Sequence, residues 1–394
     1  MQPGKNNLSG VIGTSSSEGP AISYDQIVEL IRQGAEGVAA QGRDVLPTLA
    51  ICSAFDDFNA LSVGRGLDEE TLTSLFLGHL GSSIRHASCI LGLSAASAGG
   101  LGLRWLHYSR PAESVLGSDF ALLVAAPGQE ERYRLAVFQA KRCKGSPVNV
   151  RREPNWGSDE KVDGVANAEH SIPISKETRK ERRDTRIADA DRDLDQYHAL
   201  LTGLEKGEKQ RKDFSQEMLE KLAEAQQKKH WQLTKLILLA LRLRLSFDSK
   251  DGVGVYYVLW PEQSGSAVTY ARVSAATLER RTAAQAEPAE SSAEGDSGSW
   301  TQSLALPATQ LRDLLMEWLT TEDSTDDWLD ASAAADACRM VTDCVGTVAV
   351  VDLRGPGHSP QLENALDGHD LSLRAEVKPL EGYGRHSAKS DLTL

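Results

Sequence analysis

The feature of this 394-residue sequence that most constrains its fold is a change in hydrophobic period along the chain. Between about Asp68 and Cys89 the apolar residues recur at helical spacing, which predicts an amphipathic helix. The next apolar segments are short, rich in β-forming residues and separated by Pro and Gly, which predicts three strands in a meander. These segments are residues 103–108, 119–125 and 133–141.

A second group of elements is predicted after these strands. Residues 142–188 are polar and basic with little periodicity, and we interpret them as a loop. A long helical region follows at 189–245, and residues 253–260 are apolar throughout, which is typical of a strand buried on both faces. The order helix, three-strand meander, helix and further strand predicts an α/β domain over residues 21–282 with added helical regions.

The two ends of the chain differ from this central part in composition. Residues 1–20 are predicted to be a disordered tail, and residues 283–299, rich in Ala, Glu and Ser, a disordered linker. A helix at 306–319 and a strand at 347–353 predict a smaller C-terminal α+β interaction region over residues 300–394.

Composition limits the classes of protein that this chain can belong to. Hydrophobic residues make up 40% and charged residues 25%, as in globular proteins, and the apolar runs are too short to span a membrane. The five cysteines show no CxxC spacing, which argues against a disulfide framework and a zinc site and favours a reducing cytoplasm. The first residues lack the pattern of a secretory signal.

The net charge is unusual for a protein that binds nucleic acid by itself. It is −13, whereas phosphate binding normally requires a basic surface. Residues 141–186 are the exception, with 12 Lys and Arg against 8 Asp and Glu. We therefore expect any nucleic-acid contact to come from this region or from a partner subunit.

Three groups of polar residues follow one another in an order that suits phosphodiester hydrolysis. Acidic residues begin the first predicted helix, Asp119 begins a strand, and the triplet Gln139-Ala140-Lys141 ends the next strand. Alternation along a strand places Gln139 and Lys141 on one face, where a paired strand can bring Asp119 beside them. Carboxylates and neutral oxygens bind Mg²⁺, and a nearby lysine can orient water or neutralise developing charge.

With this arrangement the sequence resembles the PD-(D/E)xK nucleases, the restriction-endonuclease-like superfamily. The resemblance rests on Asp119 and, twenty residues later, the triplet Gln139-Ala140-Lys141, and it covers about half of the chain, from Asp68 to Pro261. Gln139 replaces the usual Glu or Asp, as in Mrr-like enzymes and bacterial antiphage nucleases. This replacement removes one negative charge, so weaker metal binding should follow.

The family also places a Glu on the first core helix, facing the sheet. Glu69 lies on the same side of the predicted helix as Leu72, Phe76 and Leu80, whereas Glu70 points further round. We therefore favour Glu69, with Glu70 as the alternative.

The resemblance implies a metal site and a DNA contact at named residues. Asp119, Gln139, the carbonyl of Ala140 and Glu69 would bind Mg²⁺ or Mn²⁺, and Lys141 would assist catalysis. DNA phosphate would contact four basic residues that follow the triplet, for which a solvated loop is the alternative; they are Arg142, Lys144, Arg151 and Arg152. Taken singly, Asp119 could instead cap a turn and Lys141 could be an ordinary lysine at a strand end.

These expectations define three hypotheses of function. The first is an endonuclease acting on double-stranded DNA, the effector of a bacterial antiphage complex with regulatory, sensor or ATPase subunits. The second is a nuclease-fold module that binds DNA or a partner without efficient catalysis. The third is a structural, oligomerising subunit in which the motif is accidental. Convergence of Asp119, Gln139 and Lys141 would favour the first two, and dispersed side chains the third.

Overall fold

The structure is a computed structural model, and it describes most of the chain between residues 45 and 374. The described residues are 45–91, 102–107, 118–126, 131–143, 148–149, 176–228, 230–247, 252–274, 278–280, 300–302, 309–320, 328–353 and 360–374, together with Glu29 and Gln33. The predicted tail at 1–20 and linker at 283–299 lie outside these residues, as do the basic residues Lys144, Arg151 and Arg152.

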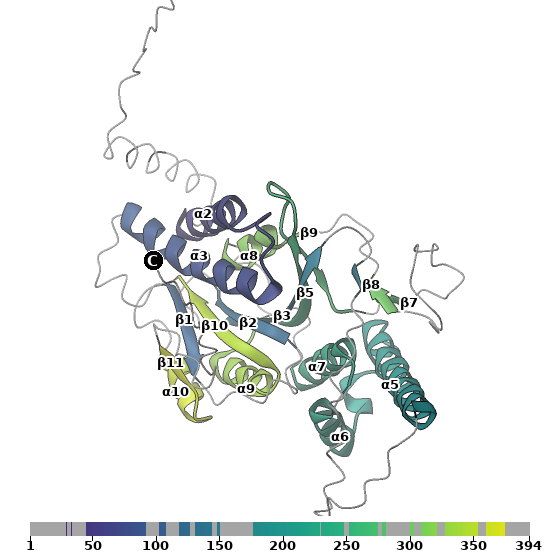
Figure 1. The fold of residues 1–394 in the computed structure, drawn as a ribbon. Coiled ribbons are helices and arrows are strands. Elements are labelled where there is room, and N and C mark those ends of the chain that lie inside the picture. The colour runs from purple at the N-terminus through teal and green to yellow at the C-terminus, as the bar shows by residue number, and fades with distance from the viewer. Residues whose placement is uncertain are drawn as a thin grey trace, which may run out of the picture.

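These residues form a mixed α/β protein with eight α-helices around an open eight-stranded sheet (Figure 1). The strand order is β11-β1-β10-β2-β3-β5-β6-β9, with β10 parallel to β2 and β3 parallel to β5. The strands are β1 (Gly102–His107), β2 (Ser118–Ala125), β3 (Tyr133–Cys143), β5 (Val253–Pro261), β6 (Thr269–Arg272), β9 (Thr309–Gln310), β10 (Val345–Asp352) and β11 (Ser372–Arg374). All four strands predicted up to residue 260 are present.

The pairing of the first three strands differs from the predicted meander. Strands β2 and β3 are antiparallel neighbours, as expected, but β1 pairs with β10 and β11 instead of β2. Strand β10, from the predicted C-terminal region 300–394, lies between β1 and β2. Residues distant in sequence thus share one sheet, because strand order is decided by long-range packing that no local pattern encodes.

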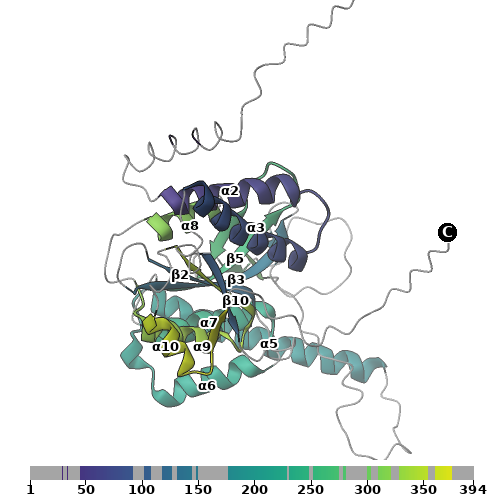
Figure 2. The same ribbon diagram turned by 90° about the vertical axis from the view of Figure 1, so that its left-hand side faces the viewer.

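Three helices cover one face of the sheet (Figure 2). They are α2 (Val45–Leu61), α3 (Glu69–Ile90) and α8 (Leu311–Thr320). Their buried side chains pack against Phe120, Phe138 and Trp260 in one apolar cluster. The helices α3 and α8 were expected from the sequence, whereas α2 was not.

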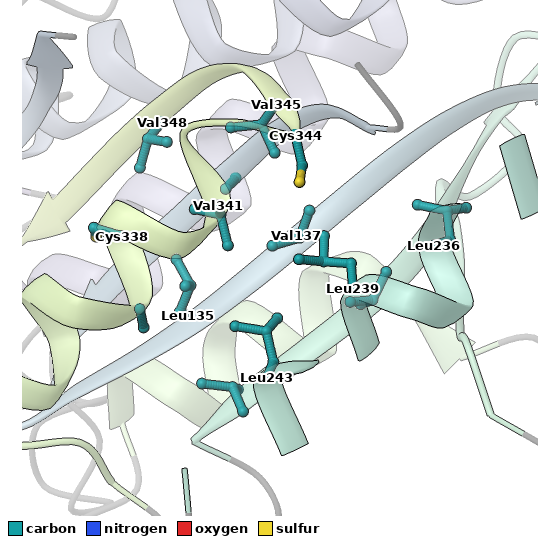
Figure 3. Packing of buried hydrophobic residues seen from close by; sticks show 14 of the residues in the cluster. Leu135, Val137, Leu236, Leu239, Leu243, Cys338, Val341, Cys344, Val345 and Val348 are labelled. Atoms are coloured by element: carbon teal, nitrogen blue, oxygen red, sulfur yellow. The ribbon is translucent and has the colours of Figure 1, made fainter. Parts of the chain in front are cut away.

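The other face is covered by five helices, α5 (Lys176–Glu205), α6 (Gln216–Gln227), α7 (Gln232–Ser246), α9 (Ala331–Val341) and α10 (Pro360–Asp367). The apolar helix α7 lies beside β5, and its Leu236 and Leu239 meet Leu135 and Val137 of β3 in a second buried cluster. Figure 3 shows how side chains from α7, α9, β3 and β10 point toward one another there. Most side chains of α7 are buried, as its apolar sequence favours.

The helical region begins earlier than predicted and is divided into the three helices α5, α6 and α7. Helix α5 starts at Lys176, within the segment 142–188 that was interpreted as a loop. It ends at Glu205, close to Gly207, whose positive φ of 72° favours glycine. The first turns of α5 are rich in charged residues and have no apolar stripe, so hydrophobic periodicity did not reveal this start.

Three short strands form a separate small sheet in the order β4-β8-β7. They are β4 (Val148–Asn149), β7 (Leu278–Arg280) and β8 (Trp300–Gln302). None of the helices within the described ranges is long and apolar enough to cross a membrane.

Candidate functional site

Asp119 and Gln139 meet at one end of the antiparallel pair β2–β3. The Nε2 of Gln139 donates a hydrogen bond to Oδ2 of Asp119 at 2.6 Å, and the backbone N–H of Ala140 donates to the same oxygen at 2.7 Å. Gln139 is 1% exposed, so its amide needs partners inside the protein. The strand alternation predicted this meeting, and the side chains of Asp119 and Gln139 do come together.

The start of β10 supports the backbone of Asp119. The N–H of Ser118 donates to the carbonyl of Cys344 at 3.1 Å, and Val345 pairs with Ser118. A Cβ atom on Gly346 would lie 3.1 Å from the carbonyl oxygen of Asp119, so a side chain there would press on the β2 backbone. The C-terminal part of the chain therefore helps to position the predicted acidic residue.

Lys141 and Glu69 form the second half of the cluster. Lys141 is buried, and its Nζ lies 3.6 Å from Oε2 of Glu69, while Oε1 of Glu69 accepts the backbone N–H of Arg142 at 3.0 Å. Glu70, the alternative, is exposed. The structure thus brings Glu69 rather than Glu70 to the end of β3, as the helical geometry favours.

The first turn of α3 is fixed on both sides of Glu69. Asp68 caps the helix by accepting the N–H of Thr71 at 2.7 Å, and this bond holds the pKa of Asp68 below its ordinary value. The hydroxyl of Thr73 donates to the carbonyl of Glu69 at 2.8 Å and accepts from the indole of Trp260 at 3.3 Å. These contacts tie the position of Glu69 to the cap and to the buried strand β5.

Gln232 is a member of the cluster that the sequence did not reveal. It begins α7, and its Nε2 donates to Oε1 of Gln139 at 2.7 Å. Asp119, Gln139 and Gln232 thus form a continuous chain of hydrogen bonds across two strands and a helix. A glutamine at the start of an apolar helix has no local signature of such a role, so only the tertiary structure could identify it.

The oxygen atoms of this cluster are of the kinds that a hard divalent cation prefers. Two carboxylates, one amide oxygen and the carbonyl of Ala140 lie on adjoining elements, and Mg²⁺ commonly uses one or two carboxylates with water completing its shell. No group of three or more His, Cys, Asp or Glu residues that could hold a metal occurs in the described part of the chain. The donor set therefore fits Mg²⁺ or Mn²⁺ in type, provided that Gln139 turns its oxygen toward Asp119.

Among the basic residues predicted to contact DNA, only Arg142 is described. Its guanidinium lies 2.8 Å from Oε1 of Glu262, and both side chains are partly exposed. Arg142 is therefore next to the cluster but engaged with a carboxylate. Lys144, Arg151 and Arg152 fall outside the described residues, so their role stays a prediction.

Comparisons with protein-family models, curated proteins and solved structures gave no match for this chain.

Proposed function

We propose that this chain is a metal-dependent endonuclease that hydrolyses phosphodiester bonds of double-stranded DNA. The observation that carries the proposal is the meeting of Glu69, Asp119, Gln139 and Lys141 at one end of β3, with Lys141 buried beside a carboxylate. Burial of a lysine and an amide is costly unless the fold compensates for it, so a purely accidental motif is a poor explanation. The contact of Asp119 with Gln139 and that of Lys141 with Glu69 support this proposal over a structural subunit with dispersed side chains.

Each residue has a role in the proposed reaction that follows from its chemistry. A bound Mg²⁺ or Mn²⁺ would polarise the scissile phosphate and lower the pKa of an attacking water. Asp119 and Glu69 would hold the cation with the carbonyl of Ala140 and the oxygen of Gln139. Lys141, held near Glu69, supplies a positive charge for the developing negative charge on phosphate.

The proposal rests on the site and not on the order of strands. A restriction-endonuclease-like core implies β1 beside β2, whereas β10 lies between them here. The helix before β1, the antiparallel pair β2–β3 and the parallel strand β5 retain the order that the resemblance implies. We therefore propose a variant of that core in which the C-terminal part of the chain has entered the sheet.

We further propose that the chain works in a cytoplasmic assembly, as the effector nuclease of a bacterial antiphage complex. The net charge of −13 opposes approach to DNA phosphate, so subunits with sensor or ATPase activity would bring the substrate to the site and control it.

A second candidate function is a nuclease-fold module with weakened catalysis that binds DNA or a partner. The hydrogen bonding of Asp119 favours it, because its Oδ2 already accepts two N–H donors. Such a module would have the geometry of a metal site but little affinity for the metal. Metal-dependent cleavage separates the two candidates.

The experiment is a plasmid-cleavage assay of the native chain with and without Mg²⁺ or Mn²⁺, alone and with the proteins encoded beside it. Asp119→Asn tests the metal ligand, and Asp57→Asn, at an exposed position on α2, is the matched control. We expect metal-dependent cleavage that Asp119→Asn abolishes and Asp57→Asn retains. Equal cleavage by Asp119→Asn, or cleavage without any divalent ion, would contradict the proposal.

A further inference from the structure

Two glutamines from distant parts of the chain are joined beside the candidate metal site. The side chain of Gln232, half-buried at the start of α7, donates through Nε2 to Oε1 of Gln139 at 2.7 Å. Gln139 in turn donates through Nε2 to Asp119 at 2.6 Å. The direction of donation therefore runs from α7 through Gln139 to the carboxylate.

This direction is imposed by the carboxylate and leaves one polar atom unsatisfied. An ionised carboxylate only accepts hydrogen bonds, so the Gln139 amide must present its N–H group to Asp119. Its oxygen then faces α7, and Gln232 must present its own N–H group in return. Consequently Oε1 of Gln232 is buried without a hydrogen-bond partner. An unsatisfied buried acceptor is costly. The pair has a second arrangement, in which both amide groups are turned over.

We propose that Gln232 is a positioning residue that sets which end of the Gln139 amide faces Asp119, and thereby controls binding of a divalent cation there. This inference rests on the proposed function and adds to it the residue that governs metal affinity. Gln232 does not contact the cation and acts through Gln139.

The reason is that a cation and a carboxylate make opposite demands on Gln139. A cation at Asp119 requires the amide oxygen, which turns the Gln139 N–H group toward α7, where an acceptor is then needed. The unsatisfied Oε1 of Gln232 is such an acceptor. A glutamine at this position can partner Gln139 in either orientation, whereas a methionine offers no comparable partner and a glutamate offers only acceptors.

The test measures binding of Mn²⁺ alone to the full chain by isothermal titration calorimetry, without DNA. We expect Gln232→Met to weaken Mn²⁺ binding by about tenfold or more, as loss of a group that orients a metal ligand does. Gln232→Glu should bind Mn²⁺ at least as tightly as the native chain, because its carboxylate attracts the N–H group of Gln139. Gln227→Glu, at an exposed position of α6, adds the same charge elsewhere and should leave binding unchanged.

We predict weaker Mn²⁺ binding for Gln232→Met and undiminished Mn²⁺ binding for Gln232→Glu, so a loss of folding cannot imitate the result. Circular dichroism melts confirm that each variant is folded before titration. Native-like Mn²⁺ affinity of Gln232→Met, or weakened Mn²⁺ binding by both variants, would overturn the inference. The proposed function would still be upheld in that case if the native chain showed metal-dependent cleavage. If the native chain bound no Mn²⁺ and cleaved no DNA, the inference and the proposed function would both fail.

Discussion

The two ends of the strand pair β2–β3 each bury a cation, but they do so in different ways. At the end where β3 begins, Arg134 lies over the ring of Trp328, with its guanidinium carbon 4.1 Å from the ring centroid. At the end where β3 finishes, Lys141 lies beside Glu69, and Asp119, Gln139 and Gln232 form their hydrogen-bonded chain. Both Arg134 and Lys141 are buried.

Under the proposed function, one end of the strand pair serves stability and the other serves catalysis. A guanidinium on an indole face adds to stability and presents no reactive group. The other end gathers two carboxylates, two amides and a lysine from four elements. Burying these groups costs desolvation energy, and their proximity brings reactive groups together. We therefore expect substitutions at the Arg134 end to alter stability and those at the Lys141 end to alter activity.

The largest effect should come from the middle of the strand pair, on which both ends depend. Phe138 is fully buried, and its ring centroid lies 4.9 Å from that of Phe120 and 5.5 Å from that of Tyr256. Phe138→Ala should lower the free energy of unfolding by about 3–5 kcal/mol, through lost contacts and a cavity. Denaturant unfolding measures this change. A loss below about 1 kcal/mol would show that this part of the core repacks freely and does not hold the two ends in place.

At the end proposed to be the active site, the two adjacent glutamates of α3 should differ sharply. Glu69→Gln should reduce cleavage by about 10- to 100-fold, because Glu69 contacts both Lys141 and the backbone of Arg142. Glu70→Gln removes the same charge from an exposed position and should leave cleavage unchanged. Initial rates of plasmid nicking measure both variants. A greater loss in Glu70→Gln would reverse the assignment of the supporting carboxylate.

At the opposite end, Arg134→Met should cost about 0.5–2 kcal/mol of unfolding free energy, the contribution of a cation–π contact. Cleavage by this variant should match that of the native chain, because Arg134 is at the other end of β3 from Lys141. Parallel unfolding and cleavage measurements provide the comparison. If Arg134→Met kept native stability but lost cleavage, the two ends of the strand pair β2–β3 would not be separate in function.

The smallest effect concerns pH and His230, which lies two residues before Gln232 and beside Asp193. Burial lowers the pKa of His230 below its ordinary value of 6.5, although Asp193 opposes this shift and Lys235 and Lys228 add to it. At pH values between the ordinary and the lowered pKa, the unfolded chain binds a proton that the folded chain does not. Stability should therefore be full above the ordinary pKa and fall as pH drops toward the lowered one.

His230→Gln should reduce this loss of stability on acidification. Thermal melts of the native chain and the variant, taken at several pH values from neutral to mildly acidic, measure the difference. Identical pH profiles would show that His230 titrates in the folded chain as it does in the unfolded one.

The parts of the fold that sequence could predict are those with a local pattern. Helix α3 and the strands β2, β3 and β5 have clear periods, and the i, i+2 alternation places Gln139 with Lys141. The position of Glu69 followed from the helical angle that it shares with Leu72 and Phe76. These local patterns, taken together with the resemblance to the PD-(D/E)xK nucleases, led to the choice of Glu69, Asp119, Gln139 and Lys141 as candidates.

The remaining features depend on contacts between distant segments. The insertion of β10 beside β2 joins residues more than two hundred positions apart, and a Cβ atom on Gly346 would crowd the carbonyl of Asp119 because the two backbones approach closely. Gln232 enters the cluster because α7 packs beside β5. Neither fact leaves a local signal in the sequence, and the absence of an apolar stripe likewise concealed the start of α5.

The most direct test compares plasmid cleavage by Lys141→Ala and Arg134→Met in Mg²⁺ or Mn²⁺, using variants shown to be folded. We predict that Lys141→Ala loses about 100- to 1,000-fold in rate, as on removal of a group that stabilises transition-state charge, whereas Arg134→Met retains native cleavage. Equal rates for Lys141→Ala and the native chain, or equal losses in both variants, would contradict the assignment of a nuclease centre to this end of β3.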